Sequence, residues 1–248
     1  MYPNAVVIGG LGVVGTATRR MLGIPWYYDH AGSNITMEEI KALKYIFLCV
    51  PTPTLQGECD VSAIRTYFDV LRDGHVYIIR STVIPGTAQK LAEEFGVPVV
   101  SNPEFLTEAT ADAECLCPDI FVLGADDEDA GLSAWNDLYW PMKGSRVFFT
   151  DTVTAELIKY AVNTFYASKV IFANALYEIA ANMGINYDTV RDALYARKWV
   201  GNNHLTVPWK GQRGLNGKCL PKDLEAFATF TGHDFFEFLV ELNRQWAE

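Results

Sequence analysis

The sequence has few basic residues, no long apolar run and no recognisable targeting segment. Twenty lysines and arginines stand against 30 acidic residues, which gives a formal net charge of −10. That sign disfavours nucleic acid and anionic membrane surfaces as partners. No stretch reaches the roughly 18–20 uninterrupted apolar residues that a bilayer span needs, and the N-terminus has no charged leader region. We therefore expect a soluble, cytoplasmic chain with no membrane or nucleic-acid partner.

Metal-binding motifs are absent as well. The five cysteines include no CxxC pair, and the four histidines provide neither an HExxH motif nor zinc-finger spacing. Cys115 and Cys117 are separated by one residue, and we interpret them as two small buried side chains near a strand rather than as a metal or redox pair. The sequence thus predicts no structural metal.

The remaining composition is that of an ordinary globular protein. Hydrophobic residues make up 50% of the 248 residues and charged residues 20%. Such a chain can bury a substantial core, which excludes disorder and fibrous repeats. Its length allows one large domain or two modest ones.

Short apolar runs alternate with amphipathic segments over residues 1–150. The expected strands are Ala5–Ile8, Ile24–Tyr28, Tyr45–Val50, Val76–Arg80, Val97–Val100, Ile120–Leu123 and Arg146–Phe149. The expected helices are a capped turn at Thr36–Glu39, then Val61–Leu71 and Thr87–Phe95. Several of these strands are apolar nearly throughout, which is typical of strands buried on both faces. The alternation predicts an α/β fold, a Rossmann-type doubly wound parallel sheet.

Residues 151–248 have a different pattern, which predicts an all-helical second domain. Ala155–Met183 contains no proline or glycine and has apolar residues at helical spacing, enough for roughly 40 Å of helix. A helix so long and apolar needs another subunit or domain on more than one face, so we expect a homodimer through it. Shorter helices are expected at Tyr187–Tyr195, Lys222–Phe230 and Asp234–Ala247, with a loop at Lys198–Gly217.

A glycine motif follows the first expected strand and opens a helix. In Gly10-Leu11-Gly12-Val13-Val14-Gly15, the first glycine permits a tight turn, the second lets a pyrophosphate approach, and the third allows close helix packing. The helix N-terminus offers its N–H groups to the phosphates. Asp29 ends the next strand, nineteen residues after Gly10. A carboxylate there binds a ribose 2′-hydroxyl and repels a 2′-phosphate, which favours NAD over NADP.

Four further segments occur in a specific order. They are Val50-Pro51-Thr52-Pro53, Ser81-Thr82-Val83-Ile84-Pro85-Gly86-Thr87, Asn102-Pro103-Glu104-Phe105-Leu106-Thr107-Glu108 and Gly217-Lys218-Cys219-Leu220-Pro221-Lys222-Asp223. With Lys159 and Asn163 on the long helix, the series resembles the UDP-glucose/GDP-mannose dehydrogenase family from Ala5 to about Asn243. The resemblance implies an NAD-dependent enzyme that oxidises the primary alcohol of a sugar nucleotide to a carboxylate in two hydride transfers.

The surroundings of Cys219 suit a nucleophile. Pro221 and an expected helix follow it, so the thiol lies in or just before a first helical turn. That position, beside Lys218 and Lys222, lowers a thiol pKa and makes thiolate accessible. Asp223 lies one helical turn further on and faces the same side.

Two other pairs show the same spacing of four residues. Lys159 and Asn163 share a helix face, and the apolar sequence around Lys159 favours a lysine that acts as a base or stabilises an oxyanion. Glu104 and Glu108 follow a strand end, where folds of this type bind ligands.

The resemblance also implies roles for individual residues. Cys219 is the nucleophile, Glu108 assists hydrolysis through water, Lys159 and Asn163 stabilise the oxyanion, Asp223 is the first base, Thr82 holds its water and Glu104 positions that network. Further implied NAD contacts are Val50, Pro51, Thr52, Ser81, Thr82 and Glu108. Implied contacts with a UDP-sugar are Phe105, Leu106, Lys159, Asn163 and Gly217.

Several positions depart from the family pattern. Asn216, Thr107 and Ile120 stand where the family has a glycine and two arginines, and the chain stops where the family continues into a C-terminal UDP-binding domain. The substrate loop is longer and carries Lys210 and Arg213. We hypothesise that these cations replace diphosphate contacts, while Trp209 stacks on a base.

Two alternatives remain open at this point. The first is a two-electron NAD-dependent dehydrogenase of a smaller alcohol or hydroxy acid, which would need no thiol. The second is a non-catalytic NAD-binding dimer, which would have no use for the candidate catalytic residues.

Overall fold

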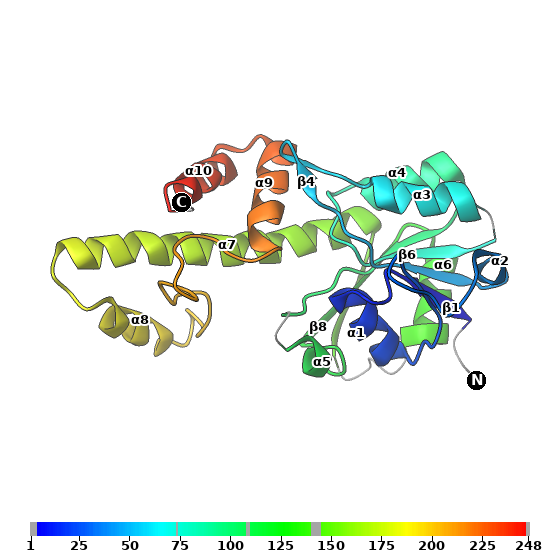
Figure 1. Cartoon of the computed structure of the whole chain (residues 1–248), viewed down its shortest axis with the longest axis horizontal. Helices are drawn as coiled ribbons and strands as arrows, with labels where there is room; N and C mark the ends of the chain where they lie inside the picture. The colour runs from blue at the N-terminus through cyan, green and yellow to red at the C-terminus, as the bar shows by residue number, and fades with distance from the viewer. Residues whose placement is uncertain (1–3, 73, 108–109, 140–144, 247–248) are drawn as a thin grey trace. The chain divides into compact units, whose positions relative to one another are not determined.

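The computed structural model describes residues 4–72, 74–107, 110–139 and 145–246, which form two compact units (Figure 1). Unit 1 comprises Met1–Pro53 and Cys59–Lys159, and unit 2 comprises Thr54–Glu58 and Tyr160–Glu248. The second unit therefore takes a short segment from the first half of the chain.

Unit 1 contains a seven-stranded sheet with the order β2-β1-β3-β6-β7-β8-β9. Its strands are β1 (Ala5–Ile8), β2 (Tyr27–Tyr28), β3 (Tyr45–Leu48), β6 (Val76–Ile79), β7 (Val99–Ser101), β8 (Ile120–Ala125) and β9 (Arg146–Thr150). Each corresponds to an expected strand, and the Rossmann-type α/β fold is confirmed.

One strand pair departs from the expected parallel arrangement. β7 and β8 are antiparallel, whereas the other neighbours in the sheet are parallel. Parallel neighbours need a crossover of a dozen or more residues, usually through a helix that returns the chain across the sheet. In the described part of the connection between β7 and β8, the only helix is the four-residue α5 (Ala111–Glu114).

Helices cover both faces of the sheet. The other helical elements of unit 1 are α1 (Val13–Leu22), α2 (Met37–Ile40), α3 (Ser62–Leu71), α4 (Thr87–Phe95), α6 (Glu128–Ala134) and the π-helical η1 (Trp135–Tyr139). Val7 and Phe47 pack on one face with residues of α1, α6 and η1. Val6 and Leu48 pack on the other with α2, α3 and α4. Successive residues of β1 and β3 thus point to opposite faces, which explains why these strands are apolar throughout.

The helix ends follow the expected signals. Thr36 and Glu39 form a complete capping box at α2. α4 ends at Gly96, which adopts the left-handed conformation with a φ of 65°. Asp127, the residue before α6, is the N-cap of this helix, and its carboxylate accepts the N–H of Ala130. These local interactions define the helix boundaries before any tertiary packing.

Unit 2 is helical and is organised around one long helix. Its helices are α7 (Thr152–Asn182), whose first eight residues belong to unit 1, α8 (Tyr187–Tyr195), α9 (Leu220–Thr231) and α10 (Asp234–Arg244). Ala167 and Ile171 of α7 pack with Leu224 of α9 and Leu239 of α10. Further along, α7 packs against α8 and the segment around Leu205. In the described part of the chain, no helix is both long and apolar enough to span a bilayer.

All but the last residue of a small hairpin also belongs to unit 2. It pairs β4 (Thr54–Leu55) with β5 (Glu58–Cys59). The Thr54 hydroxyl donates to the carbonyl of Lys222 in α9 at 2.8 Å. Gly57 has a φ of +86° and lies so close to Thr229 that a side chain at this position would overlap the Thr229 hydroxyl. The hairpin is therefore fitted to the surface of α9.

One face of α7 leaves large apolar side chains exposed. Phe165, Phe172 and Ile179 recur at intervals of seven residues and are 62%, 55% and 53% exposed. Residues seven apart lie on nearly the same side of an α-helix. These three residues form what we call the α7 stripe.

Candidate active site

The glycine motif forms the turn between β1 and α1. Gly15 lies against Gly9, and a Cβ at Gly15 would overlap the Gly9 carbonyl. Gly12 is the N-cap of α1, and a Cβ there would meet only the Gly9 carbonyl, at 3.5 Å. A side chain at Gly12 would thus occupy open space beside the helix N-terminus, where an anion would bind. The motif therefore fits a dinucleotide pyrophosphate.

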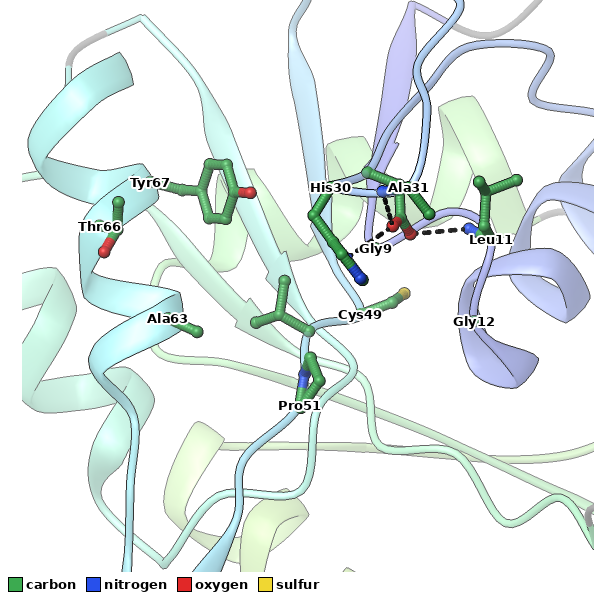
Figure 2. Close-up of a pocket in the computed structure, with 12 residues that line it drawn as sticks. Gly9, Leu11, Gly12, His30, Ala31, Cys49, Pro51, Ala63, Thr66 and Tyr67 are labelled. Atoms are coloured by element: carbon green, nitrogen blue, oxygen red, sulfur yellow. Dashed lines mark hydrogen bonds and ion pairs between the residues drawn. The ribbon is translucent and has the colours of Figure 1, made fainter.

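A pocket of about 550 Å³ lies beside this turn in unit 1 (Figure 2). Its lining includes five of the expected cofactor contacts: Leu11, Gly12, Asp29, Val50 and Pro51. Seven lining residues were not anticipated: Gly9, His30, Ala31, Cys49, Ala63, Thr66 and Tyr67. Ala63, Thr66 and Tyr67 lie on α3, and residues three and four positions apart share a face of a helix. That spacing was the sequence signal that could have identified them as pocket residues.

Asp29 follows β2 directly and is held in place by hydrogen bonds and by an ion pair with His30. Its side chain is 6% exposed, and its carboxylate accepts N–H groups from Leu11 at 3.0 Å and Ala31 at 3.1 Å. Burial raises the pKa of Asp29, but the hydrogen bonds from these two N–H groups outweigh it, and the pKa lies below its usual value. The carboxylate is therefore ionised at neutral pH and suits a ribose 2′-hydroxyl better than a 2′-phosphate.

Among the described residues, the other expected NAD contacts are not part of the pocket wall. Gly10 packs beneath Tyr27, and Val13 and Val14 form the first turn of α1. The Thr52 hydroxyl donates to the Thr82 carbonyl at 2.6 Å, and the Ser81 hydroxyl donates to the Val50 carbonyl at 2.7 Å. These two bonds connect the Val50–Pro53 and Ser81–Thr87 motifs.

Two glycine substitutions should affect different properties, one the affinity for NAD and the other the stability of the fold. Gly12→Ala is expected to weaken NAD binding by about tenfold with little change in Tm, because the added methyl group enters only the open space beside the helix. Gly15→Ala is expected to destabilise the protein by about 2 kcal/mol, because the methyl group overlaps the Gly9 carbonyl. Isothermal titration with NAD and thermal unfolding would measure both. Equal changes in Tm for the two variants would contradict this assignment.

Lys159 and Glu104 form a buried ion pair in unit 1. The Lys159 ammonium is 3.2 Å from the Glu104 carboxylate, donates to the Glu104 carbonyl at 2.6 Å and lies over the Phe105 ring. The other carboxylate oxygen of Glu104 accepts the N–H of Leu106. The expectation of apolar surroundings for Lys159 was wrong, because its sequence neighbours did not reveal the carboxylate that folds back onto it. Glu108 lies outside the described residues.

A second buried carboxylate, Glu156, was missed in the sequence. It lies three residues before Lys159 on α7, is 2% exposed and accepts the N–H groups of Gly86, Thr87 and Ala88 at the start of α4. Burial raises the pKa of Glu156 to about 7, although these three hydrogen bonds oppose the shift. Glu156 thus anchors the Ser81–Thr87 motif to α7.

Cys219 is the N-cap of α9 and is exposed. Pro221 occupies the first turn, and Gly217 precedes it with a φ of +86°. The N–H of Asp223 closes the first turn on the Cys219 carbonyl at 3.0 Å. The thiol therefore lies at the positive end of a helix dipole, a position that stabilises a thiolate.

Asp223 connects this helix to α7 within unit 2. Its side chain is 1% exposed, and one carboxylate oxygen accepts the Asn163 amide N–H at 2.6 Å. The other oxygen pairs with the Lys222 ammonium. Two expected catalytic residues, 60 positions apart, are thus in direct contact.

Lys210 and Arg213, the two cations of the substrate loop, have different surroundings. The Arg213 guanidinium lies 3.0 Å from the Glu178 carboxylate and donates to the Asn174 amide oxygen at 3.3 Å. Lys210 is exposed and lies over the Trp209 ring. Contact of both cations with a diphosphate stays a prediction, and Arg213 would have to exchange Glu178 for phosphate. Among the described residues, no three His, Cys, Asp or Glu side chains are grouped to hold a metal.

Comparisons with known proteins cover most of the chain. The NAD binding domain model of the UDP-glucose/GDP-mannose dehydrogenase family matches residues 30–143, and the family's central domain model matches residues 153–244. UDP-glucose 6-dehydrogenase of Rickettsia conorii is 32% identical over 204 residues, which cover 78% of this chain and 46% of that protein. GDP-mannose 6-dehydrogenase of Pseudomonas syringae pv. syringae is 32% identical over 222 residues, 81% of this chain and 49% of that protein. The chain thus spans about half the length of these relatives.

Solved structures of dehydrogenases share the fold of this chain. A UDP-glucose dehydrogenase from Pyrobaculum islandicum superposes with a TM-score of 0.83 at 26% identity, over 99% of this chain and 68% of that chain. A 3-hydroxyisobutyrate dehydrogenase from Mycobacterium tuberculosis shares the fold, with a TM-score of 0.75 at 18% identity, over 99% of this chain and 94% of that chain. With both domain models matched in order, the chain belongs to the UDP-glucose/GDP-mannose dehydrogenase family.

Proposed function

We propose that this chain is an NAD-dependent sugar-nucleotide 6-dehydrogenase that oxidises UDP-glucose, or a similar UDP-sugar, to the uronate. The family match and the relatives named for UDP-glucose support the reaction class. NAD, when bound, accepts the hydride in each oxidation. The Gly10–Gly15 turn, the open space at Gly12 and the ionised Asp29 suit that cofactor.

The observation that carries the proposal is the position of Cys219 one turn before the Asp223–Asn163 pair. In the proposed sequence, the alcohol loses a hydride and a proton to give an aldehyde, with Asp223 and a water held by Thr82 serving as base. The Cys219 sulfur then adds to the aldehyde carbon and forms a thiohemiacetal. Loss of a second hydride and a proton gives a thioester, and water releases the carboxylate and the thiol. Covalent capture retains the aldehyde between the two oxidations.

The remaining residues stabilise charge and position water. Lys159 and Asn163 lie four residues apart on α7 and present an ammonium and an amide N–H, both suitable donors to a developing oxyanion. Glu104 holds Lys159 in its present orientation through the ion pair at 3.2 Å. Glu108 completes the scheme by assisting hydrolysis through water.

Counting NADH per sugar tests this proposal. Two NADH formed per UDP-glucose would support it, and the uronate would be the product detected by mass spectrometry. One NADH per substrate would indicate a two-electron dehydrogenase of a smaller alcohol or hydroxy acid. Binding of NAD without turnover of any alcohol would indicate a non-catalytic NAD-binding dimer. Parallel assays with GDP-mannose separate the two sugar-nucleotide classes named among the relatives.

We also propose that two copies associate through the α7 stripe. Phe172 lies in the middle of the stripe, and aromatic side chains at the centre of an interface typically contribute 2 kcal/mol or more. Phe172→Glu should therefore raise the dimer Kd by at least about thirtyfold, as measured by analytical ultracentrifugation. The matched control is Phe235→Glu on α10, a residue with 50% exposure outside the stripe. A monomeric wild-type protein, or equal effects of both variants, would contradict the proposal.

A cytoplasmic location is part of the same proposal. All five cysteines carry thiols, and two of them, Cys117 and Cys219, are exposed. Exposed thiols persist in a reducing compartment, where a catalytic thiol also stays active.

A further inference from the structure

Arg80 is a buried cation that has no carboxylate partner among the residues that the structure describes. It follows β6 directly and is 5% exposed. Its guanidinium donates to the amide oxygen of Asn102, which also accepts the Tyr139 hydroxyl at 2.9 Å. Its Nε has no hydrogen-bond partner, and in the described ranges no acidic side chain lies within ion-pair distance of it. The Glu104 carboxylate, two residues after Asn102 in the sequence, is paired with Lys159.

A buried, unpaired guanidinium is costly to the folded state, because the interior replaces only part of its hydration. Asn102 is 0% exposed and Tyr139 is 0% exposed, so the three side chains form a closed network that holds the charge in one place. Such an arrangement fixes a positive potential in the interior of unit 1.

The network lies next to the pocket wall. The backbone N–H of Arg80 donates to the Leu48 carbonyl at 2.9 Å, and Ser81 donates to the Val50 carbonyl through its hydroxyl. Val50 itself and Cys49, which lies between Leu48 and Val50, line the pocket. Burial raises the pKa of the Cys49 thiol most, the charge of Arg80 acts to lower that pKa, and the Glu104 carboxylate acts more weakly to raise it.

Two halves of a dinucleotide bind on opposite sides of the point where the strand order reverses. Asp29 and the glycine motif suit the adenosine half, at β2 and β1. The nicotinamide half would then extend along the carboxyl ends of β3, β6 and β7, where Arg80 and Asn102 follow their strands.

Resting on the proposed function, we propose that Arg80 makes this pocket favour the reduced cofactor over the oxidised one. The oxidised nicotinamide ring carries a positive charge and the reduced ring is neutral, so a fixed cation beneath the site repels only the oxidised form. The same repulsion favours acceptance of a hydride by the bound cofactor. At an effective dielectric constant near 20, two unit charges within about 12 Å change an affinity by about tenfold.

The test compares the Kd values for NADH, by fluorescence titration, and for NAD⁺, by calorimetry. Wild-type protein should bind NADH about tenfold more tightly, and Arg80→Met should bring the two Kd values close together. Arg80→Lys, which keeps the charge, should retain most of the preference. Tyr139→Phe is the matched control: it removes a hydrogen bond to Asn102 but no charge, and should lower Tm while leaving the Kd ratio unchanged.

Three results would overturn the inference. They are equal affinities in the wild-type protein, an unchanged ratio in Arg80→Met, or the same change of ratio in Tyr139→Phe. Equal affinities in the wild-type protein would overturn the inference without any variant, and Arg80→Gln is a second neutral variant if Arg80→Met fails to fold. The cofactor titrations contain no sugar nucleotide. A wild-type protein that binds neither NADH nor NAD⁺ would refute the proposed function. A wild-type protein that binds both with equal affinity would refute only the role of Arg80.

Discussion

Replacing Cys219 with alanine is expected to reduce formation of the uronate by at least about 10³-fold while NAD binding stays unchanged. The reason is chemical: without the thiol, the aldehyde cannot be held as a thiohemiacetal, and the second hydride transfer loses its substrate. Stopped-flow absorbance at 340 nm would count the NADH formed per sugar, and mass spectrometry would identify the product. The variant should yield at most one NADH per UDP-glucose.

The matched control is Cys117→Ala, since Cys117 is also an exposed cysteine but belongs to none of the motifs. It should retain two NADH per sugar. Cys219→Ser tests whether a poorer nucleophile at the same N-cap gives a slow second step. Normal uronate formation by Cys219→Ala would refute covalent catalysis and favour two successive direct oxidations.

Removing the charge of Glu156 is expected to change how stability depends on pH. Burial raises the pKa of Glu156 from 4.5 to about 7 in the folded protein. Between these values the folded chain holds a proton that the unfolded chain has released, so the free energy of unfolding falls as the pH rises. Over the whole window the loss is about 3 kcal/mol. Glu156→Gln stays neutral and should lack this loss.

Urea unfolding at pH 5 and pH 8, followed by circular dichroism, would measure the difference between wild type and Glu156→Gln. Taking that difference cancels the contributions of the other carboxylates. Glu39→Gln is a control that should show little change between these pH values: hydrogen bonds from Thr36 hold the pKa of Glu39 below its usual value of 4.5, so its contribution is lost only as the pH falls below that value. A wild-type minus Glu156→Gln difference that is the same at both pH values would contradict the prediction.

The sequence was sufficient to predict most of the local structure. All seven strands of the sheet were expected, and α4 and α8 have the predicted bounds, because capping residues and glycines define helix ends locally. β2 and β7 begin later than expected, at Tyr27 and Val99, just beyond Pro25 and Pro98. A proline cannot donate to a strand ladder.

Contacts between distant residues were harder to predict. Asp29 and the glycine turn could be anticipated, since both belong to one local motif with known spacing. The partners of Lys159 and Arg80 could not, because Glu104 and Asn102 approach them only once the sheet has formed. Strand direction was likewise invisible: the composition of β8 is the same whether it runs parallel or antiparallel to β7.

The hairpin of β4 and β5 constrains how this chain is made. Thr54 and its partner Lys222 are 168 residues apart, so the ribosome must add that many residues after Thr54 before the two can meet. At 5–20 residues per second, this interval is roughly 8–34 s. During that time Gly57 and its neighbours are exposed without the α9 surface that they fit. Unit 2 therefore cannot complete its fold until α9 has been synthesised, although its first segment, Thr54–Glu58, precedes most of unit 1 in the sequence.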